Sequence, residues 1–150
     1  MNTFWLKCSV IATVMFCSTA YAEVEIDLAR IMAIESGGDI FAFNPRTSAT
    51  GPYQITPICL KDYNEHGDGG HYYMIDLADV QISKRIAYWY INTRIPSLLG
   101  AFGVPDGVDT RLWAYNGGIK AVKRGFMAKE TRDYIERYHN EGVYDKKRSF

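Results

Sequence analysis

The chain has 150 residues, of which 47% are hydrophobic and 23% charged, so it can bury a core and does not have the composition of a disordered chain. Its 17 basic and 17 acidic side chains give a formal net charge of zero, which offers no reason to expect a nucleic-acid partner. These values favour a single globular domain.

The first 22 residues have the pattern of a secretory signal peptide. Lys7 supplies a positive charge, residues 8–16 are apolar, and residues 20–22 read Ala-Tyr-Ala, the small-x-small form of a cleavage site. The apolar stretch is too short to span a membrane. We therefore expect residues 1–22 to be removed and residues 23–150 to form an exported periplasmic domain without a membrane anchor.

Cleavage would leave Cys59 as the one cysteine of the mature chain, which excludes an internal disulfide. We expect this thiol to be buried, because it lies between Ile58 and Leu60 in a helical context. Lipoprotein processing at Cys17 is a weaker alternative, since Phe16 stands where a small residue is normally required.

Residues 26–36 predict the first helix of the domain, because apolar side chains recur at helical spacing, and the glycine pair that follows would end it. Residues 41–56 are rich in Asn, Pro, Ser, Thr and Gly, which predicts a loop with a short extended piece at residues 53–55. Thr56 before Pro57 is a strong helix start, with a capping hydroxyl and a proline in the first turn.

The second half of the chain is also predicted to be helical. A long helix is expected from Asp76 or Asp79 to Thr93, and residues 96–107 would form a connection. Asp109 is expected to cap the helix after that connection. The remaining predicted helices cover residues 109–116, 120–124 and 129–140, followed by a frayed basic tail at residues 146–148. The fold class is therefore mainly α, in one domain with at most a small strand element.

Glu35 has a position that needs explaining. It lies four residues after Ile31 and so continues the apolar face of the first helix. It also lies in the last turn, where the helix dipole disfavours a carboxylate. Both effects raise a carboxyl pKa and would make Glu35 a usable general acid near neutral pH. A glutamate that bends into solvent at a frayed helix end is an equally open interpretation from spacing alone.

Four short motifs occur in order along the chain. They are Glu-Ser-Gly-Gly at residues 35–38, Gly-Pro-Tyr-Gln-Ile at 51–55, Ala-Tyr-Asn-Gly-Gly at 114–118 and Glu-Thr-Arg-Asp-Tyr-Ile at 130–135. Each is weak alone, but together they make the chain resemble the soluble type of lytic transglycosylase. The resemblance extends from about Ile26 to Tyr138. It implies a lysozyme-like fold and an enzyme without a cofactor that cuts the glycan strands of peptidoglycan.

The resemblance also implies roles for individual residues. Glu35 matches the catalytic glutamate, and Gln54 matches a glutamine that borders the substrate cleft. Tyr115 and Asn116 match an alanine-tyrosine-asparagine motif whose tyrosine lies close to the catalytic carboxyl group. Tyr134 matches a tyrosine that faces the same site.

The chain departs from the family pattern at several places. Asn44 stands nine residues after Glu35, where a serine is common, and its amide can still donate and accept hydrogen bonds. Residues 52–53 are Pro-Tyr where two aliphatic residues are usual, and Gly117 replaces an alanine. These departures affect the expected shape of the cleft and the details of substrate binding.

The reaction implied by the resemblance uses Glu35 first as an acid and then as a base. The C6 hydroxyl of N-acetylmuramic acid would attack its own anomeric carbon and give a 1,6-anhydro product. A hydrolytic muramidase, with Asp39 as the nearest candidate to activate water, and a wall-binding protein without turnover remain alternatives.

Further sites are not expected. His66, Asp68 and His71 in a glycine-rich loop lack a recognised metal-ligand spacing, and a solvated loop is the favoured interpretation. By analogy, a catalytic domain this small resembles the specialised members that open the wall for a secretion system, a conjugation machine or a pilus.

Overall fold

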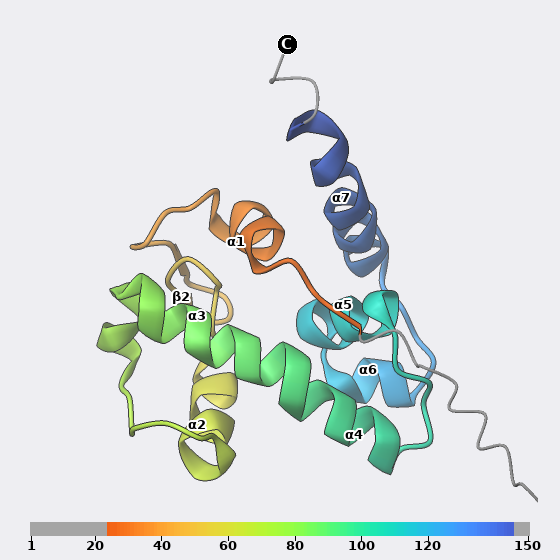
Figure 1. Cartoon of the computed structure of the whole chain (residues 1–150), viewed down its shortest axis with the longest axis horizontal. Coiled ribbons are helices and arrows are strands. Elements are labelled where there is room, and N and C mark those ends of the chain that lie inside the picture. Colours follow the sequence, from red (N-terminus) through yellow and green to blue (C-terminus); the bar gives the residue numbers. More distant parts are fainter. Residues whose placement is uncertain (1–23, 146–150) are drawn as a thin grey trace, which may run out of the picture.

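The computed structural model describes residues 24–145, and the side chains of residues 24–140. The predicted signal peptide and the basic tail at residues 146–148 lie outside the described residues. Helices dominate, as predicted (Figure 1). The α-helices are α1 (Leu28–Ser36), α2 (Pro57–His66), α3 (Val80–Trp89), α4 (Ile95–Ala101), α5 (Val108–Gly117), α6 (Ile119–Lys123) and α7 (Lys129–Asp145). The shorter elements are the 3₁₀-helix η1 (Met74–Ala78), the π-helical turn η2 (Tyr90–Arg94) and the strands β1 (Phe43–Asn44) and β2 (Ala49–Thr50).

Helix α1 has both of its ends defined by local hydrogen bonds. The Asp27 side chain accepts from the backbone N–H of Ala29 at 2.9 Å, which is a standard N-cap, so the helix begins two residues later than predicted. Gly37 ends the helix in the left-handed region, with φ of 64°. The predicted end at Ser36 is confirmed, and Glu35 therefore lies in the last helical turn.

The segment predicted as a loop contains the small sheet. Strands β1 and β2 pair antiparallel, with Phe43 opposite Thr50. The extended piece predicted at residues 53–55 is wrong, because residues 51–54 form a turn and Ile55 makes a single bridge to Thr50. Gln54 has a φ of 48°, which an extended strand does not allow.

Helices α3 and α4 are joined end to end through η2 (Figure 1). The connection predicted from Pro96 onward is therefore wrong over residues 96–101. Pro96 lies in the first turn of α4, where a missing N–H costs little. The preceding N–H, that of Ile95, bonds to the carbonyl of Tyr90, five residues back, so the π-turn carries the helix into the proline.

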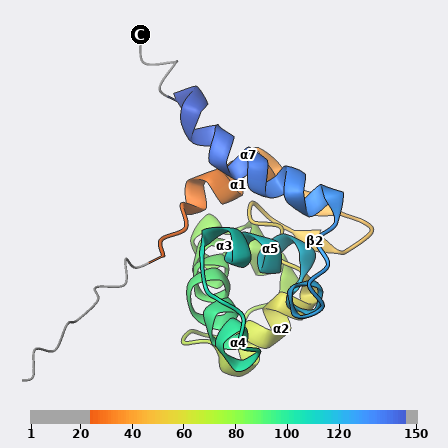
Figure 2. The same ribbon diagram turned by 90° about the vertical axis from the view of Figure 1, so that its right-hand side faces the viewer.

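The last helices differ from prediction at their boundaries. Asp109 does not cap α5; it lies inside the first turn, and its carboxylate is 2.6 Å from His139 on α7. Helix α7 continues to Asp145, five residues beyond the predicted end. Figure 2 shows α7 lying across α1 on one side of the molecule.

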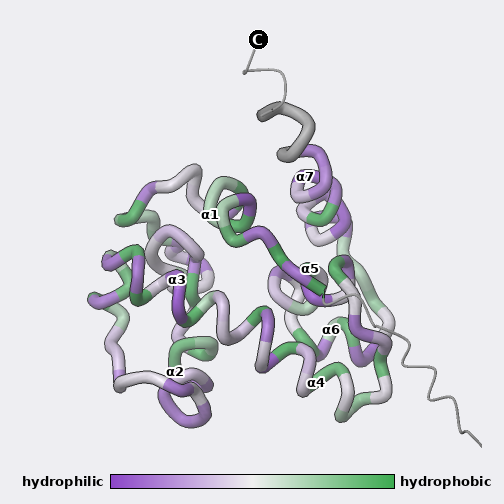
Figure 3. The backbone as a smooth tube through the Cα atoms, in the orientation of Figure 1, coloured by the Kyte–Doolittle hydropathy of each residue, from purple (hydrophilic) through white to green (hydrophobic). Residues whose placement is uncertain are grey.

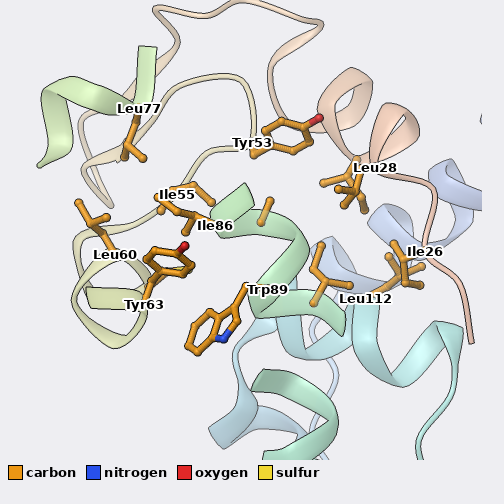
Figure 4. Packing of buried hydrophobic residues seen from close by; sticks show 14 of the residues in the cluster. Ile26, Leu28, Tyr53, Ile55, Leu60, Tyr63, Leu77, Ile86, Trp89 and Leu112 are labelled. Carbon is orange, nitrogen blue, oxygen red and sulfur yellow. The ribbon is translucent and has the colours of Figure 1, made fainter. Parts of the chain in front are cut away.

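The core joins both halves of the chain. One cluster includes Ile31, Ile86, Leu112 and Tyr134, and the aromatic rings of Tyr63 and Trp89 meet edge to face within it (Figure 4). Cys59 is only 7% exposed, which confirms that the thiol is buried. Within residues 24–145, no helix has the length and apolar character needed to cross a membrane.

Candidate active site

The carboxyl group of Glu35 meets helix α7 through one hydrogen bond. The hydroxyl of Tyr134, 99 positions later in the chain, donates to Glu35 Oε1 at 2.9 Å. The Tyr134 side chain is 1% exposed, so the rest of its ring is enclosed by the core. Helix α7 packs against α1 (Figure 2), and the hydrogen bond between the two helices fixes the direction of the half-buried carboxyl group.

The surroundings of Glu35 bring its pKa close to neutral. Burial has the largest effect and raises the pKa of Glu35. The hydrogen bond from Tyr134 and the positive charge of Arg137 lower it, and the pKa is about 7. The same contact raises the pKa of Tyr134, because burial and the nearby Glu35 both disfavour a phenolate. Tyr134 therefore stays a donor, and Glu35 can be protonated or ionised near neutral pH.

The turn at residues 51–54 is attached to the end of α1 by Ser36. The Ser36 hydroxyl donates to the carbonyl of Pro52 at 2.9 Å and accepts from the backbone N–H of Gly38 at 3.1 Å. Gly51 begins the turn with a φ of 79°, and a Cβ there would lie 2.3 Å from the Leu77 carbonyl oxygen. Only glycine fits that position without a backbone shift.

Tyr115 holds the same turn from helix α5. Its hydroxyl donates to the carbonyl of Tyr53 at 2.7 Å. The pKa of Tyr115 is raised well above its usual value, first by burial and then by the charge of Glu35. The structure thus brings Glu35 of α1 and Tyr134 of α7 into direct contact. Tyr115 of α5 holds the turn to which Ser36 is also bonded.

Two of the three amide residues proposed from the resemblance, Gln54 and Asn44, form hydrogen bonds within the protein. The Gln54 side chain donates to the carbonyls of Ala42 and Gly51, at 3.2 and 3.1 Å, and so joins the turn to the segment before β1. Asn44 is half-buried on β1, and its side-chain oxygen accepts from the N–H of Arg46 at 3.0 Å. Asn116 is half-buried on α5. Substrate binding by these three residues stays a prediction.

Two residues near the carboxyl group were not found by sequence reasoning. Ser36 belonged to the first motif, but its role in holding Pro52 depends on a turn that lies sixteen positions away. Arg137 lies one helical turn after Tyr134 on α7, and its guanidinium is 5.8 Å from the Tyr134 ring centroid. The i, i+3 spacing of Tyr134 and Arg137 was the available signal.

Two of the three candidate metal ligands near the glycine-rich loop, His66 at the end of α2 and Asp68, have contacts of their own. The Tyr63 hydroxyl donates to Asp68 at 3.3 Å, and His66 lies 3.2 Å from Asp62, which also binds Arg94. Among the described residues, no three potential metal ligands gather at one place.

A groove of about 1100 Å³ opens at the other end of α1. It is lined by residues 24–30 together with residues of α3, η2, α5 and α7. Glu35, Tyr115 and Tyr134 are not among them. The groove is therefore separate from the candidate active site. The site is assigned from the Glu35 carboxyl group and the contacts around it.

Comparison with known proteins shows the family of the chain. A family model described as "Transglycosylase SLT domain" matches residues 16–137, most of the chain. No curated protein and no solved structure matches the chain. The family match covers Glu35, the turn at residues 51–54, Tyr115 and Tyr134.

Proposed function

Because this chain belongs to the transglycosylase SLT domain family, we propose that it cuts the β-1,4 bond between N-acetylmuramic acid and N-acetylglucosamine with Glu35 as its acid and base. Members of the family are lytic transglycosylases, so the chain is an enzyme that cleaves glycosidic bonds of peptidoglycan. The observation that carries the finer proposal is the Glu35 carboxyl group, which has a pKa of about 7 and accepts a hydrogen bond from Tyr134.

In the first step, protonated Glu35 donates its proton to the oxygen of the glycosidic bond. That bond breaks, N-acetylglucosamine leaves with a free C4 hydroxyl, and positive charge develops at the anomeric carbon of N-acetylmuramic acid. The Tyr134 hydroxyl stabilises the carboxylate that forms, because its hydrogen bond to Glu35 is stronger when the acceptor is charged.

In the second step, the C6 hydroxyl of the same sugar attacks the anomeric carbon. The Glu35 carboxylate accepts the hydroxyl proton, a 1,6-anhydro ring closes, and Glu35 returns to its protonated form. A carboxyl pKa near 7 suits both steps, because neither protonation state is costly at neutral pH.

The hydrolytic alternative needs a second carboxylate to activate water. Asp39 is exposed, and its carboxylate accepts the N–H of Phe41 at 2.9 Å within its own turn. The charge that acts on Glu35 is that of Arg137, a cation. These observations favour attack by the C6 hydroxyl over attack by water.

Mass spectrometry of the products released from purified peptidoglycan tests this proposal. The chain beginning at Glu23 should release muropeptides with 1,6-anhydro ends. Products with reducing muramic acid ends would replace the proposal with a muramidase, and binding without release would replace it with a non-catalytic wall-binding protein.

We also propose that the enzyme is exported to the periplasm and opens the wall locally for a secretion, conjugation or pilus complex. The signal-peptide pattern of residues 1–22 supports export. The role in an envelope complex rests on analogy with small specialised enzymes. Fractionation of cells should place the protein in the periplasm and remove residues 1–22, and cross-linking there should capture a component of such a complex.

A further inference from the structure

Helix α6 and the loop after it carry several basic side chains around an exposed aromatic ring. Lys120, Lys123 and Arg124 have i, i+3 and i+4 spacing, which places them on one side of α6, and all three are exposed. Phe126, two residues later, is 66% exposed. We name these four residues, together with Phe102, the basic tip.

The basic tip is an ordered surface that combines two parts of the chain. Helix α6 lies against the end of α4 (Figure 1), and Lys123 Nζ is 4.6 Å from the ring centroid of Phe102, which follows α4 and is 39% exposed. The backbone N–H of Phe126 bonds to the carbonyl of Ala121 at 3.1 Å, which fixes the loop that holds the ring outward. The hydropathy view shows hydrophilic stretches of α6 close to apolar residues of α4 (Figure 3).

The positive charge at this end of the molecule is local. The whole chain has a formal net charge of zero, so a cluster of cations here is compensated elsewhere. Among the side chains of residues 24–140, no carboxylate forms an ion pair with Lys120, Lys123 or Arg124.

The acidic side chains at the start of α7 have other partners. Glu130 lies 3.9 Å from Arg46 of the hairpin, and Asp133 lies 2.6 Å from Lys129. Their charges are therefore offset by other cations. Arg124, at the end of α6, donates its Nε–H to the carbonyl of Lys120 at 3.1 Å, which leaves its two Nη groups and the ammonium groups of Lys120 and Lys123 available to an external anion.

We propose that the basic tip docks this protein onto the surface of an anionic lipid bilayer. Lys120, Lys123 and Arg124 would face the lipid phosphates, and the Phe126 ring would enter the boundary between headgroups and acyl chains. A soluble polyanion would use the cations but would have no need of the exposed ring. The surface is distinct from the candidate active site, so this inference does not depend on the proposed reaction.

Vesicle co-sedimentation tests the proposal with the chain that begins at Glu23. The protein should bind phosphatidylglycerol vesicles, bind phosphatidylcholine vesicles weakly, and lose affinity as salt is raised. A combined Lys120→Gln, Lys123→Gln and Arg124→Gln variant should lose affinity on the order of 100-fold, at roughly fivefold for each charge. Phe126→Ser should lose about tenfold.

Matched control variants test whether binding depends on the basic tip itself or on charge and apolar surface anywhere on the protein. Lys61→Gln, Lys84→Gln and Arg85→Gln together remove the same charge from α2 and α3, and Ile58→Ser removes an apolar side chain that is 81% exposed. Both controls should bind anionic vesicles like the unmodified chain. Circular dichroism should show every variant folded, and peptidoglycan cleavage without vesicles should be unchanged.

Three outcomes would overturn the proposal. The unmodified chain could fail to bind phosphatidylglycerol vesicles, or the charge control could lose as much affinity as the tip variant. If Phe126→Ser binds normally while the charge variant does not, the surface is a site for soluble polyanions and not for a bilayer. Absence of peptidoglycan cleavage by the unmodified chain would refute the proposed reaction and leave the vesicle result as it stands.

Discussion

Substitution of Glu35 by Gln should abolish cleavage and, at neutral or alkaline pH, make the fold more stable. Glutamine has nearly the same shape, and its side-chain oxygen can still accept the Tyr134 hydrogen bond. It cannot donate a proton to the glycosidic oxygen or accept one from the C6 hydroxyl. Loss of acid–base catalysis typically lowers turnover about 10²–10⁴-fold, and the upper end is expected because one residue serves both steps.

The stability gain follows from the difference in pKa between the folded and unfolded chains. Burial raises the pKa of Glu35 from 4.5 to about 7, so the folded protein binds its proton more tightly than the unfolded chain does. The stability that Glu35 contributes is fully present below pH 4.5, falls as pH rises toward 7, and is lost above that. This difference in the pKa of Glu35 corresponds to about 3 kcal/mol of unfolding free energy.

Glutamine carries no charge at any of these pH values and avoids this loss. Thermal melting should therefore show Glu35→Gln and the unmodified chain within a few degrees at pH 4 and separated by about 10 °C at pH 8. Turnover measured on the same preparations separates catalysis from folding. A melting difference that does not change between the two pH values would refute the assigned burial of the carboxyl group. Turnover near that of the unmodified chain would remove Glu35 from the catalytic role.

Three further substitutions test the surroundings of the site. Cys59→Ser should keep turnover and cost about 1–2 kcal/mol of unfolding free energy if the new hydroxyl has no partner, as measured by denaturant titration; loss of turnover in a folded variant would contradict a structural role. Ser36→Ala removes the hydrogen bond to the Pro52 carbonyl, so it should lower the unfolding free energy by about 1–2 kcal/mol and also lower kcat. An unchanged kcat would show that catalysis does not need the hydrogen bond between Ser36 and the turn. Arg137→Gln removes the cation that lowers the pKa of Glu35, so the alkaline limb of the pH profile of kcat/KM should move to higher pH. Arg137→Lys keeps the charge and should leave the limb in place. Identical pH profiles for the two variants would contradict the charge effect.

The sequence was sufficient to single out Glu35 and the tyrosine that donates to its carboxyl group, Tyr134, but not Ser36 or Arg137. Glu35 could be singled out because it continues an apolar helical face, and the motifs supplied Tyr115 and Tyr134. The role of Ser36 was not predictable, because it acts on a carbonyl group of a distant turn and carbonyl positions leave no trace in side-chain patterns. For Gln54, the place beside the substrate cleft stays a prediction. Its bonds to Ala42 and Gly51 were not predictable, because they depend on a left-handed φ that glutamine rarely adopts.

The fold was predicted best where long apolar periodicity was present. Helices α1, α2 and α7 have clear caps or stripes, and the end of α1 and the starts of α2 and α7 are confirmed. The hairpin has strands of only two residues each, too short for an alternating pattern to be recognised. Pro96 was interpreted as a break because a proline normally disrupts an α-helix, and the π-turn that carries the helix into it depends on the packing of Tyr90 and Ile91 in the core.

The opposing effects on the pKa of Glu35 explain why the site needs helix α7 as well as α1. The end of α1 alone would leave the carboxyl group in water, with a pKa close to 4.5, and too little of the acid form would exist at neutral pH. Burial without a donor would raise the pKa further, and the protonated acid would then give up its proton less readily in the first step. Tyr134 and Arg137 limit the effect of burial and hold the pKa at about 7, so one side chain can give and take the same proton. Because both residues lie on α7, the contact between α7 and α1 that closes the core also sets the acidity of the catalytic group.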